Sequence, residues 1–491
     1  MDKKLYQLTN PQKSIWYTEQ FFKNTPINNI CSYAVIHENL NFDVLKKAIN
    51  LVVKQNDAFR LQFCLQNNEI MQYVKEYKEF DIEIIDLVNE KQLQKLEKDL
   101  SNEIFDIFNS DLYLVKLIQF PDHSGAVLLN VHHLIADSWG MGLAIKEILK
   151  NYRALLKNEK YEPKFSYIDY IKSENEYIES SIFTKDAEYW KEIFKTIPEQ
   201  ATIPSLKNSK TSSNAAKRLS FTLGTNIMKK INSVCSENKI SVFNFFMAVY
   251  SLYLSRVSGI DDFVIGTPII NRKNVQEKNT MGMFINTLPL RINITNQNQF
   301  KDFCKNISIN LLSSFRHQKY SYNNVLNDLR KQNSNIPNLY NFLISYQITK
   351  AVDNEFGDYS ANWMFNNCCG NDINIHLHDL NDSGELLVSY DYLLDKYISK
   401  DMKDIHNRIL HIIEQVIQNM EINLNNIEII TPKEKEKMLD NFNNMKIHYP
   451  TNETILSLFE KQVIKTPDNI AVKIIDDRGI ESLKVIRIGD E

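Results

Sequence analysis

The chain has 491 residues, of which 43% are hydrophobic and 24% charged, so it can bury a large core. At roughly 150 residues per domain, this length corresponds to two to four compact units. The formal net charge is −4 and the basic and acidic residues are interspersed, which argues against nucleic acid or an anionic membrane as a partner. The densest apolar stretch, Phe243–Leu254, is too short to span a bilayer, and the amino terminus lacks the apolar segment of a signal peptide. We therefore expect a cytoplasmic protein.

Six cysteines are scattered over the chain, and only Cys368 and Cys369 are adjacent. No Cys-x-x-Cys pair is present, so we interpret the cysteines as reduced packing residues rather than as a disulfide framework or a metal site.

Helical and strand patterns interleave along the chain, which predicts an α/β architecture. Apolar residues recur at helical spacing after Asp43, which we expect to be the N-cap of that helix. A buried strand is predicted at Gly125–Val131, followed by a helix at Met141–Leu156. The polar and aromatic segment Phe165–Lys210 has the composition of a connector between two lobes.

A second α/β half follows this connector. Its predicted elements are a helix at Ser241–Val257, a strand at Phe263–Ile270, helices at Gln299–Arg316 and Tyr322–Lys331, strands at Asn341–Gln347 and Leu386–Tyr390, and a long helix at Lys400–Met420. Beyond Asn425 the residues become polar, which predicts a short helix and a linker.

Residues that can carry chemistry lie between the strand at Gly125–Val131 and the next helix. Two histidines, His132 and His133, are adjacent there and face opposite ways if the chain stays extended, so only one can point into a given cavity. The other has a structural role. Asp137 precedes the helix and can either cap it or hold a cation, and both roles would fix the intervening turn.

Two other interpretations of these histidines are simpler. A histidine at a strand end is most often a hydrogen-bonded core residue. A zinc site needs three or four ligands, and neighbouring His132 and His133 converge poorly on one ion without a third ligand at a supporting spacing, so we expect no metal.

The sequence of this turn, Val-His-His-Leu-Ile-Ala-Asp-Ser-Trp-Gly at 131–140, resembles the His-His-x-x-x-Asp-Gly signature of condensation domains of nonribosomal peptide synthetases. Epimerisation domains and some lipid acyltransferases share this motif. Other blocks favour condensation domains, because similar segments occur in the family's order at Leu8–Tyr17, Asn56–Phe63, Tyr167–Tyr170, Asp262–Pro268 with Asn271 and Arg272, Met281–Arg291, and His317–Tyr320.

The resemblance implies a fold of two chloramphenicol acetyltransferase-like lobes, arranged as a V around a central tunnel. It implies an acyltransferase that joins a donor acyl thioester to the amine of an acceptor aminoacyl thioester, forming an amide. We expect no cofactor bound by the chain itself, because both substrates would arrive on phosphopantetheine arms of upstream and downstream peptidyl or acyl carrier proteins. An adenylation domain would be adjacent, and we expect a monomer.

The family's catalytic position falls on His133, which could accept a proton from the attacking amine or only position it by a hydrogen bond. The resemblance makes His132 a supporting residue and pairs Asp137 with Arg60 in an ion pair. Ser138 departs from the family, which usually has glycine there, and could narrow the tunnel beside His133 unless the turn simply has no need of a positive φ.

Two neighbours of Ser138 complete the motif. Gly140 stands where serine or threonine is common, and Trp139 directly after Ser138 resembles condensation domains that accept L-configured donors. Trp139 thus argues against an epimerisation domain. The two histidines exclude a heterocyclisation domain, whereas a noncatalytic module that recruits a carrier or another partner typically loses the motif.

The source of the donor remains open between two alternatives. Because Met1 stands directly before the first block, we expect the donor to come from outside the chain. A carrier-bound aminoacyl or peptidyl group is the preferred donor, and a fatty acyl group on coenzyme A or an acyl carrier protein, as in a lipoinitiating N-acyltransferase, is the alternative.

The resemblance divides the chain into an N-terminal lobe at 1–175, a C-terminal lobe at 176–430, a linker at 431–450 and the incomplete start of an adenylation domain at 451–491. The last assignment rests on Ile455–Gln462 and Thr466–Val472. No glycine-rich phosphate loop follows, so we expect no ATP binding by this chain.

Overall fold

The computed structural model describes residues 4–88, 92, 93, 96, 100–161, 165–205, 213–294, 299–332, 334–336, 338–349, 359–380, 383–441, 452–467, 474, 475, 481 and 482. The chain separates into two units, Met1–Thr431 and Pro432–Glu491. The lobes expected at 1–175 and 176–430 both fall within the first unit, and the boundary between them stays a proposal.

A five-stranded sheet forms the first layer of the large unit, with the strand order β12-β2-β7-β6-β5. Its strands are β2 (Asn29–Ile36), β5 (Ile84–Asp86), β6 (Tyr113–Gln119), β7 (Gly125–His132) and β12 (Tyr359–Met364). Helices α2 (Phe42–Gln55) and α4 (Ser138–Leu156) pack against one face of this sheet, and every residue of β7 is buried. The central strand β7 therefore leads directly from the core into the histidine motif.

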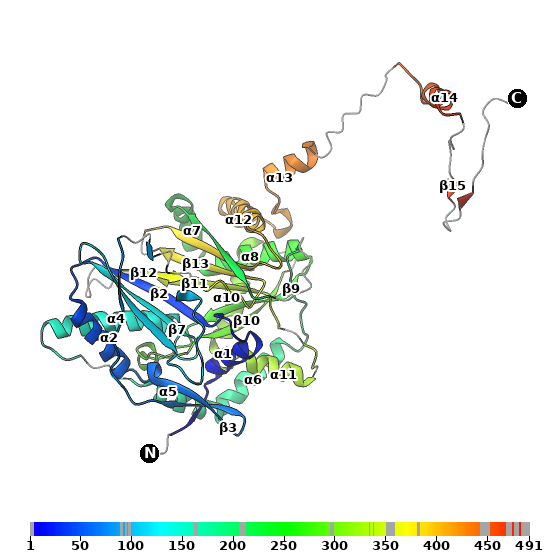
Figure 1. The fold of residues 1–491 in the computed structure, drawn as a ribbon. Helices are drawn as coiled ribbons and strands as arrows, with labels where there is room; N and C mark the ends of the chain where they lie inside the picture. Colours follow the sequence, from blue (N-terminus) through cyan, green and yellow to red (C-terminus); the bar gives the residue numbers. More distant parts are fainter. Residues whose placement is uncertain are drawn as a thin grey trace. The chain divides into compact units, whose positions relative to one another are not determined.

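A six-stranded sheet forms the second layer, with the order β10-β9-β11-β13-β14-β8. Its strands are β8 (Ala216–Leu223), β9 (Asp262–Ile269), β10 (Asn286–Asn293), β11 (Phe342–Thr349), β13 (Ile373–Leu380) and β14 (Leu386–Leu393). One face packs on the helices α7 (Thr225–Asn238), α8 (Val242–Ser258), α10 (Phe300–Arg316) and α12 (Ser399–Gln418) (Figure 1). The opposite face of β9 and β10 packs on α6 (Ser181–Ile193) and α11 (Tyr322–Gln332).

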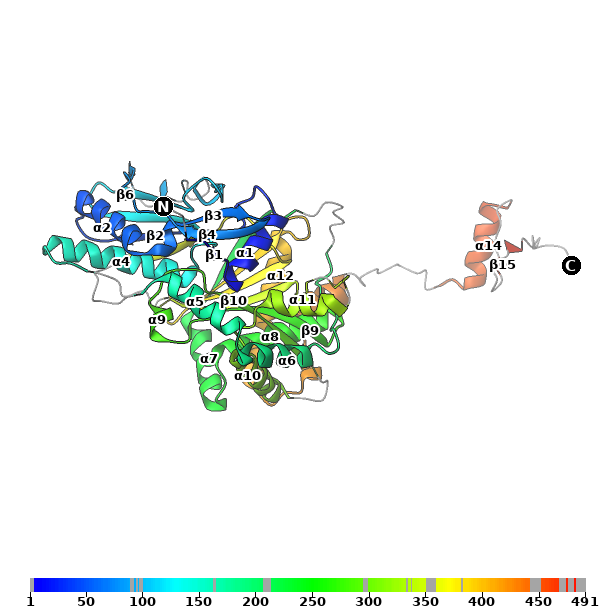
Figure 2. The same cartoon turned by 90° about the horizontal axis from the view of Figure 1, so that it is seen from below.

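Two connections join these layers. Strand β12 follows the six-stranded sheet's β11 in the chain but pairs antiparallel with β2 of the five-stranded sheet. Helix α1 (Asn10–Phe21) lies next to α11 (Figure 1 and Figure 2). The two helices are joined by a hydrogen bond of 2.7 Å from Nδ2 of Asn323 to Oγ of Ser14. The two halves thus share a sheet edge and a helix contact.

The predicted α/β fold is confirmed, with two local corrections. The helix after residue 41 is capped by Asn41, whose side chain accepts the N–H of Val44, and Asp43 lies in its first turn instead. The expected connector at Phe165–Lys210 contains two helices, α5 (Tyr167–Ile178) and α6, and each buries an aromatic side together with one carboxylate, Glu174 in α5 and Asp186 in α6.

The other elements of the large unit are short. They are a three-stranded sheet of β1 (Tyr6–Gln7), β3 (Leu61–Gln66) and β4 (Glu69–Val74), the helix α9 (Val275–Lys278), and 3₁₀ turns at Asp57–Arg60 and Leu424–Asn426.

Four of the six cysteines, Cys31, Cys235, Cys304 and Cys369, are buried. Among the described residues, no group of three His, Cys, Asp or Glu side chains is placed to hold a metal ion. In the same residues, no single helix has the length and apolar character to cross a membrane, although the sharply bent pair α7 and α8 passes that test jointly.

The second unit contains α13 (Pro432–Glu436), a π-helical turn at Lys437–Asn441, α14 (Ile455–Lys465) and a small sheet of β15 (Ile474–Ile475) and β16 (Glu481–Ser482). Residues 442–450 of the expected linker, and residues 451, 468–473, 476–480 and 483–491 of the expected adenylation start, lie outside the described residues.

Candidate active site at the histidine turn

The histidine turn, residues 132–137, joins the end of β7 to the start of α4. The backbone N–H of His132 donates to the carbonyl of Leu112 at 2.9 Å, and that of His133 donates to the carbonyl of Asn28 at 2.8 Å. The turn is also tied to α1, because Nε2 of Gln12 donates to the carbonyl of Leu134 at 2.9 Å. The backbone on both sides of His133 is therefore held by hydrogen bonds.

His132 is buried, with 3% of its surface exposed. Its Nδ1 accepts the backbone N–H of Leu134 at 3.1 Å, and its Nε2 lies 3.4 Å from Oε2 of Glu19. The ring of Phe105 packs edge-on against it. Both ring nitrogens of His132 are thus engaged by the protein.

His133 is half-buried. Its Nδ1 is buried and has no hydrogen-bond partner in the described part of the chain. Burial lowers the pKa of His133 to about 4, and the nearby carboxylate of Asp137 opposes this change only in part. A neutral imidazole at physiological pH follows from this lowered pKa.

Asp137 is wholly buried and uses both carboxylate oxygens. Oδ1 accepts the N–H of Gly140 at 2.7 Å and so caps α4, while Oδ2 accepts the backbone N–H groups of Phe284 at 2.9 Å and Ile285 at 3.1 Å. Its cation is Arg272, whose Nη1 and Nη2 donate to the two oxygens at 2.7 and 3.0 Å. Asp137 therefore performs both roles that the sequence left open, capping and cation binding.

The predicted ion pair between Asp137 and Arg60 is wrong. Nη1 of Arg60 donates to the carbonyl of Lys75 at 2.9 Å, and its Nε is buried without a partner in the part of the chain that the structure describes. Arg60 ends the 3₁₀ turn before β3, which directs its side chain to the neighbouring strand β4 and not to the histidine turn.

Arg272, which pairs with Asp137, belongs to the second half of the chain. Its remaining N–H groups donate to the carbonyls of Ile270, Glu277 and Gly282, and its guanidinium lies 4.0 Å from the ring centroid of Phe284. Every side of the cation is thus paired, as a buried charge requires.

The first residues of α4 also contact the segment 271–285. Nε1 of Trp139 donates to the carbonyl of Lys278 at 2.8 Å, although the indole is 39% exposed. A Cβ on Gly140 would lie 3.2 Å from the carbonyl oxygen of Gly282, so glycine allows the two backbones to approach. Gly282 itself has φ +148° and sits on the ring of Tyr167.

Ser138 begins α4 and is half-buried. It does not adopt a positive φ, so the turn has no conformational need for the family's glycine at this position. Whether its side chain narrows a tunnel stays a prediction.

Sequence reasoning assigned no role to three residues that hold the turn: Gln12, Glu19 and Arg272. Gln12 and Arg272 lie inside the segments that carried the family resemblance, which was the available signal. Glu19 lies beyond the first of these segments, and its spacing on α1 does not distinguish it from an exposed helical glutamate.

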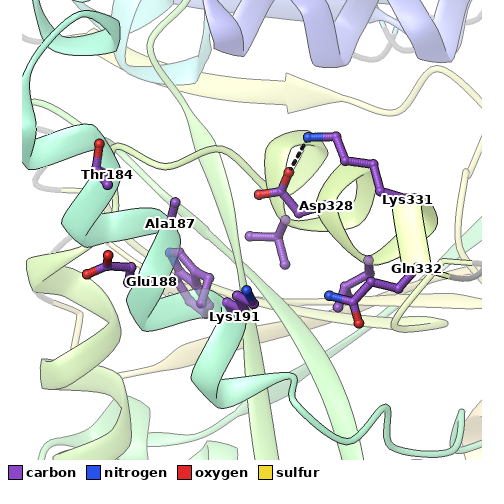
Figure 3. A pocket seen from close by; sticks show the side chains of 10 residues that line it. Thr184, Ala187, Glu188, Lys191, Asp328, Lys331 and Gln332 are labelled. Atoms are coloured by element: carbon purple, nitrogen blue, oxygen red, sulfur yellow. Dashed lines mark hydrogen bonds and ion pairs between the residues drawn. The ribbon is translucent and has the colours of Figure 1, made fainter.

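A cavity of about 330 Å³ lies between α6 and α11 (Figure 3). Its lining residues are Thr184, Ala187, Glu188, Trp190, Lys191, Val325, Asp328, Leu329, Lys331 and Gln332. None of them belongs to the histidine turn or its supports, and Asp328 and Lys331 neutralise each other at 2.8 Å. We therefore place the candidate active site at the histidine turn and not in this cavity.

A family model for the condensation domain matches residues 2–439. The chain belongs to the condensation domain family. This condensation domain is 31% identical over 491 residues to surfactin synthase subunit 1 of Bacillus subtilis, covering 98% of the chain and 14% of that protein. It is 26% identical over 475 residues to gramicidin S synthase 2 of Brevibacillus brevis, covering 96% and 10%. The chain thus spans less than a fifth of either relative, and the nonribosomal peptide synthetase type of the domain is confirmed.

Solved condensation domains have the same fold. A variant of the starter condensation domain of rhizomide synthetase RzmA in complex with C8-CoA aligns with a TM-score of 0.75 and 20% identity, covering 87% of this chain and 98% of that one. The first condensation domain of the CDA synthetase aligns with a TM-score of 0.72 and 18% identity, covering 87% and 99%.

Proposed function

We propose that this chain catalyses amide bond formation between a donor acyl thioester and the amine of an acceptor aminoacyl thioester on a carrier protein. The observation that carries the proposal is His133, a neutral histidine held on both sides by backbone hydrogen bonds beside a fully paired Asp137. The substrates would arrive on phosphopantetheine arms, through a tunnel between two lobes arranged as a V. The domain would act in the cytoplasm as a monomer, next to an adenylation domain.

The reaction needs little covalent assistance. A thioester is already activated, and a neutral amine attacks it once both ends are held together, which supplies an effective molarity on the order of 10⁵ M. The amine loses a proton as the amide forms and the thiol of the donor arm leaves. Positioning the two arms is therefore a large part of the proposed catalysis.

The low pKa of His133 bears on its role. Moving a proton from an ammonium group with a pKa near 8 to an imidazole with a pKa of about 4 is uphill by about 5 kcal/mol. This difference favours a histidine that orients the amine by accepting its hydrogen bond over one that takes the proton outright. The general-base role stays the alternative.

The proposal is tested by incubating the domain with a donor carrier and an acceptor carrier, each loaded with its thioester, and measuring the amide on the acceptor arm by mass spectrometry. Amide that forms with wild type and falls at least about tenfold with His133→Ala supports the proposal. Equal yields with both proteins would show that His133 has no part in the reaction.

A second candidate differs only in the donor, which would be an acyl group on coenzyme A. It is favoured by the starter condensation domain solved with C8-CoA, although this likeness rests on the fold alone. Equal concentrations of a medium-chain or long-chain acyl-coenzyme A and an aminoacyl carrier, offered with one loaded acceptor, separate the two. If only the coenzyme A thioester acylates the acceptor, the donor is an acyl-coenzyme A and not the preferred carrier-bound aminoacyl or peptidyl group.

A further inference from the structure

Helix α1 places a carboxylate next to the histidine turn. Oε2 of Glu19 accepts a hydrogen bond from Nδ2 of Asn28 at 2.8 Å and lies 3.4 Å from Nε2 of His132. The side chain of Glu19 is 12% exposed and that of His132 is 4% exposed. One oxygen atom therefore serves two buried nitrogen groups at the same place.

The hydrogen bonds of His132 define its tautomer. Nδ1 accepts the backbone N–H of Leu134, so this nitrogen carries no proton. The proton of the neutral ring is then on Nε2, which faces the carboxylate of Glu19. Glu19 is the acceptor that keeps the ring in this tautomer and in this orientation.

Asn28 links Glu19 to His133 by hydrogen bonds. Its side chain is bound by Glu19 and by the carbonyl of Ile15, while its own backbone carbonyl accepts the N–H of His133 at 2.8 Å. Asn28 is 4% exposed, so water cannot easily replace these contacts. Glu19 is thus connected to His133 in two ways. One is through the ring of His132, the preceding residue, and the other is through Asn28, whose carbonyl accepts the N–H of His133.

We propose that Glu19 is a positioning residue for His133, acting through His132 and Asn28. This inference rests on the proposed function of His133 as the residue that orients the acceptor amine. Without the Glu19 oxygen, Nε2 of His132 loses its acceptor and Nδ2 of Asn28 keeps only the carbonyl of Ile15, so the turn gains freedom to satisfy these donors elsewhere. A small displacement of His133 is enough to weaken a reaction that depends on near-attack geometry.

Two substitutions of Glu19 distinguish the effect of its acceptor oxygen from the effect of its side-chain size. Glu19→Ala removes the acceptor, whereas the amide oxygen of Glu19→Gln can occupy the same place and receive both donors. Gln20→Ala is the control, because Gln20 is the next residue of the same helix and its side chain is exposed. We expect Glu19→Ala to lower kcat at least about tenfold with KM for the acceptor carrier within about twofold, Glu19→Gln to stay within about threefold of wild type, and the control to be unchanged.

Melting curves are recorded for each variant, so that activity is compared only where the protein is folded. Unchanged kcat in a folded Glu19→Ala variant would overturn the inference. So would a glutamine variant as impaired as the alanine variant, or a loss of activity that merely follows the unfolded fraction.

A readout without catalysis distinguishes this inference from the proposed function. Imidazole ¹⁵N spectra of histidine-labelled protein are expected to show one tautomer for His132 in wild type and in Glu19→Gln, and shifted signals of His132 and His133 in Glu19→Ala. If wild type forms no amide, the proposed function fails while these spectra still test the positioning. Identical spectra of all three proteins would contradict it.

Discussion

Asp137 and Arg272 are 135 positions apart in the chain, yet two hydrogen bonds of 2.7 and 3.0 Å join the carboxylate to the guanidinium, and neither side chain has exposed surface. The pair connects the histidine turn to the segment that follows β9. Such a pair contributes little net stability, but removing one partner strands a buried charge. The connection is therefore costly to break.

Replacing Arg272 with alanine is expected to lower the free energy of unfolding by roughly 3–5 kcal/mol, because the carboxylate of Asp137 loses its cation inside the protein. Asp137→Ala should cost a similar amount. Urea unfolding followed by circular dichroism measures both. The matched control is Arg60→Ala, expected to cost less than about 2 kcal/mol because one hydrogen bond to Lys75 is lost. Equal losses for Arg60 and Arg272 would contradict the pairing.

A glycine in the same segment leads to a second prediction. A Cβ on Gly282 would overlap the ring of Tyr167, and the residue has φ +148°. Gly282→Ala should therefore destabilise the protein by about 3 kcal/mol or more, because Tyr167 is buried and held by the carbonyl of Met283. The control is Gly142→Ala in α4, where a Cβ meets no atom within 4 Å. It should gain about 0.5–1 kcal/mol, and thermal melts that rank the two variants the other way would refute the prediction.

The α/β fold and the position of the histidine turn were predictable because they depend on local patterns. A short, nearly continuous apolar run defined the strand at Gly125–Val131, which β7 extends by one residue, and helical periodicity defined α4 after it. Order along the chain, together with the motif, was enough to place His133 at a strand-to-helix turn.

The partner of Asp137 was not predictable from the sequence, because every arginine carries the same charge and the sequence does not show which one lies near Asp137. Arg60 and Arg272 both lie in segments similar to the family, and only the packing of 271–285 against α4 decides between them. The helices in the supposed connector were missed for a related reason. Their buried side is aromatic, as with Tyr170 and Trp190, and their polar surface dominated the composition.

The pH dependence of stability follows from the pKa of His133. It is lowered from an ordinary value of 6.5 to about 4 in the folded protein, so the unfolded chain binds the extra proton between these values. His133 therefore supports the folded state fully above pH 6.5, and this contribution is lost as the pH falls towards 4. In His133→Gln, the decrease in unfolding free energy over this interval should be smaller than in wild type by on the order of 2–3 kcal/mol.

Other groups titrate in the same interval, and the comparison with a variant removes them. His378 and His406 also have pKa values lowered by burial to about 4, whereas burial raises the pKa of Glu147 to about 7 and opposes them. These three groups are common to both proteins. Parallel curves for His133→Gln and wild type would show that the imidazole is not held neutral.

The same pKa determines how amide formation should depend on pH. Because His133 is already neutral well below pH 6, it contributes no inflection between pH 6 and 9, and the rate should rise with the deprotonation of the acceptor amine, whose pKa is about 8. His133→Ala should lower the rate at least about tenfold at each pH and leave the shape of the profile unchanged, since the amine still titrates. Single-turnover measurements with saturating loaded carriers give this profile without product release. An inflection near pH 6.5 in wild type that disappears in the alanine variant would instead mean that His133 titrates with an ordinary pKa, which would remove the energetic argument against the general-base role.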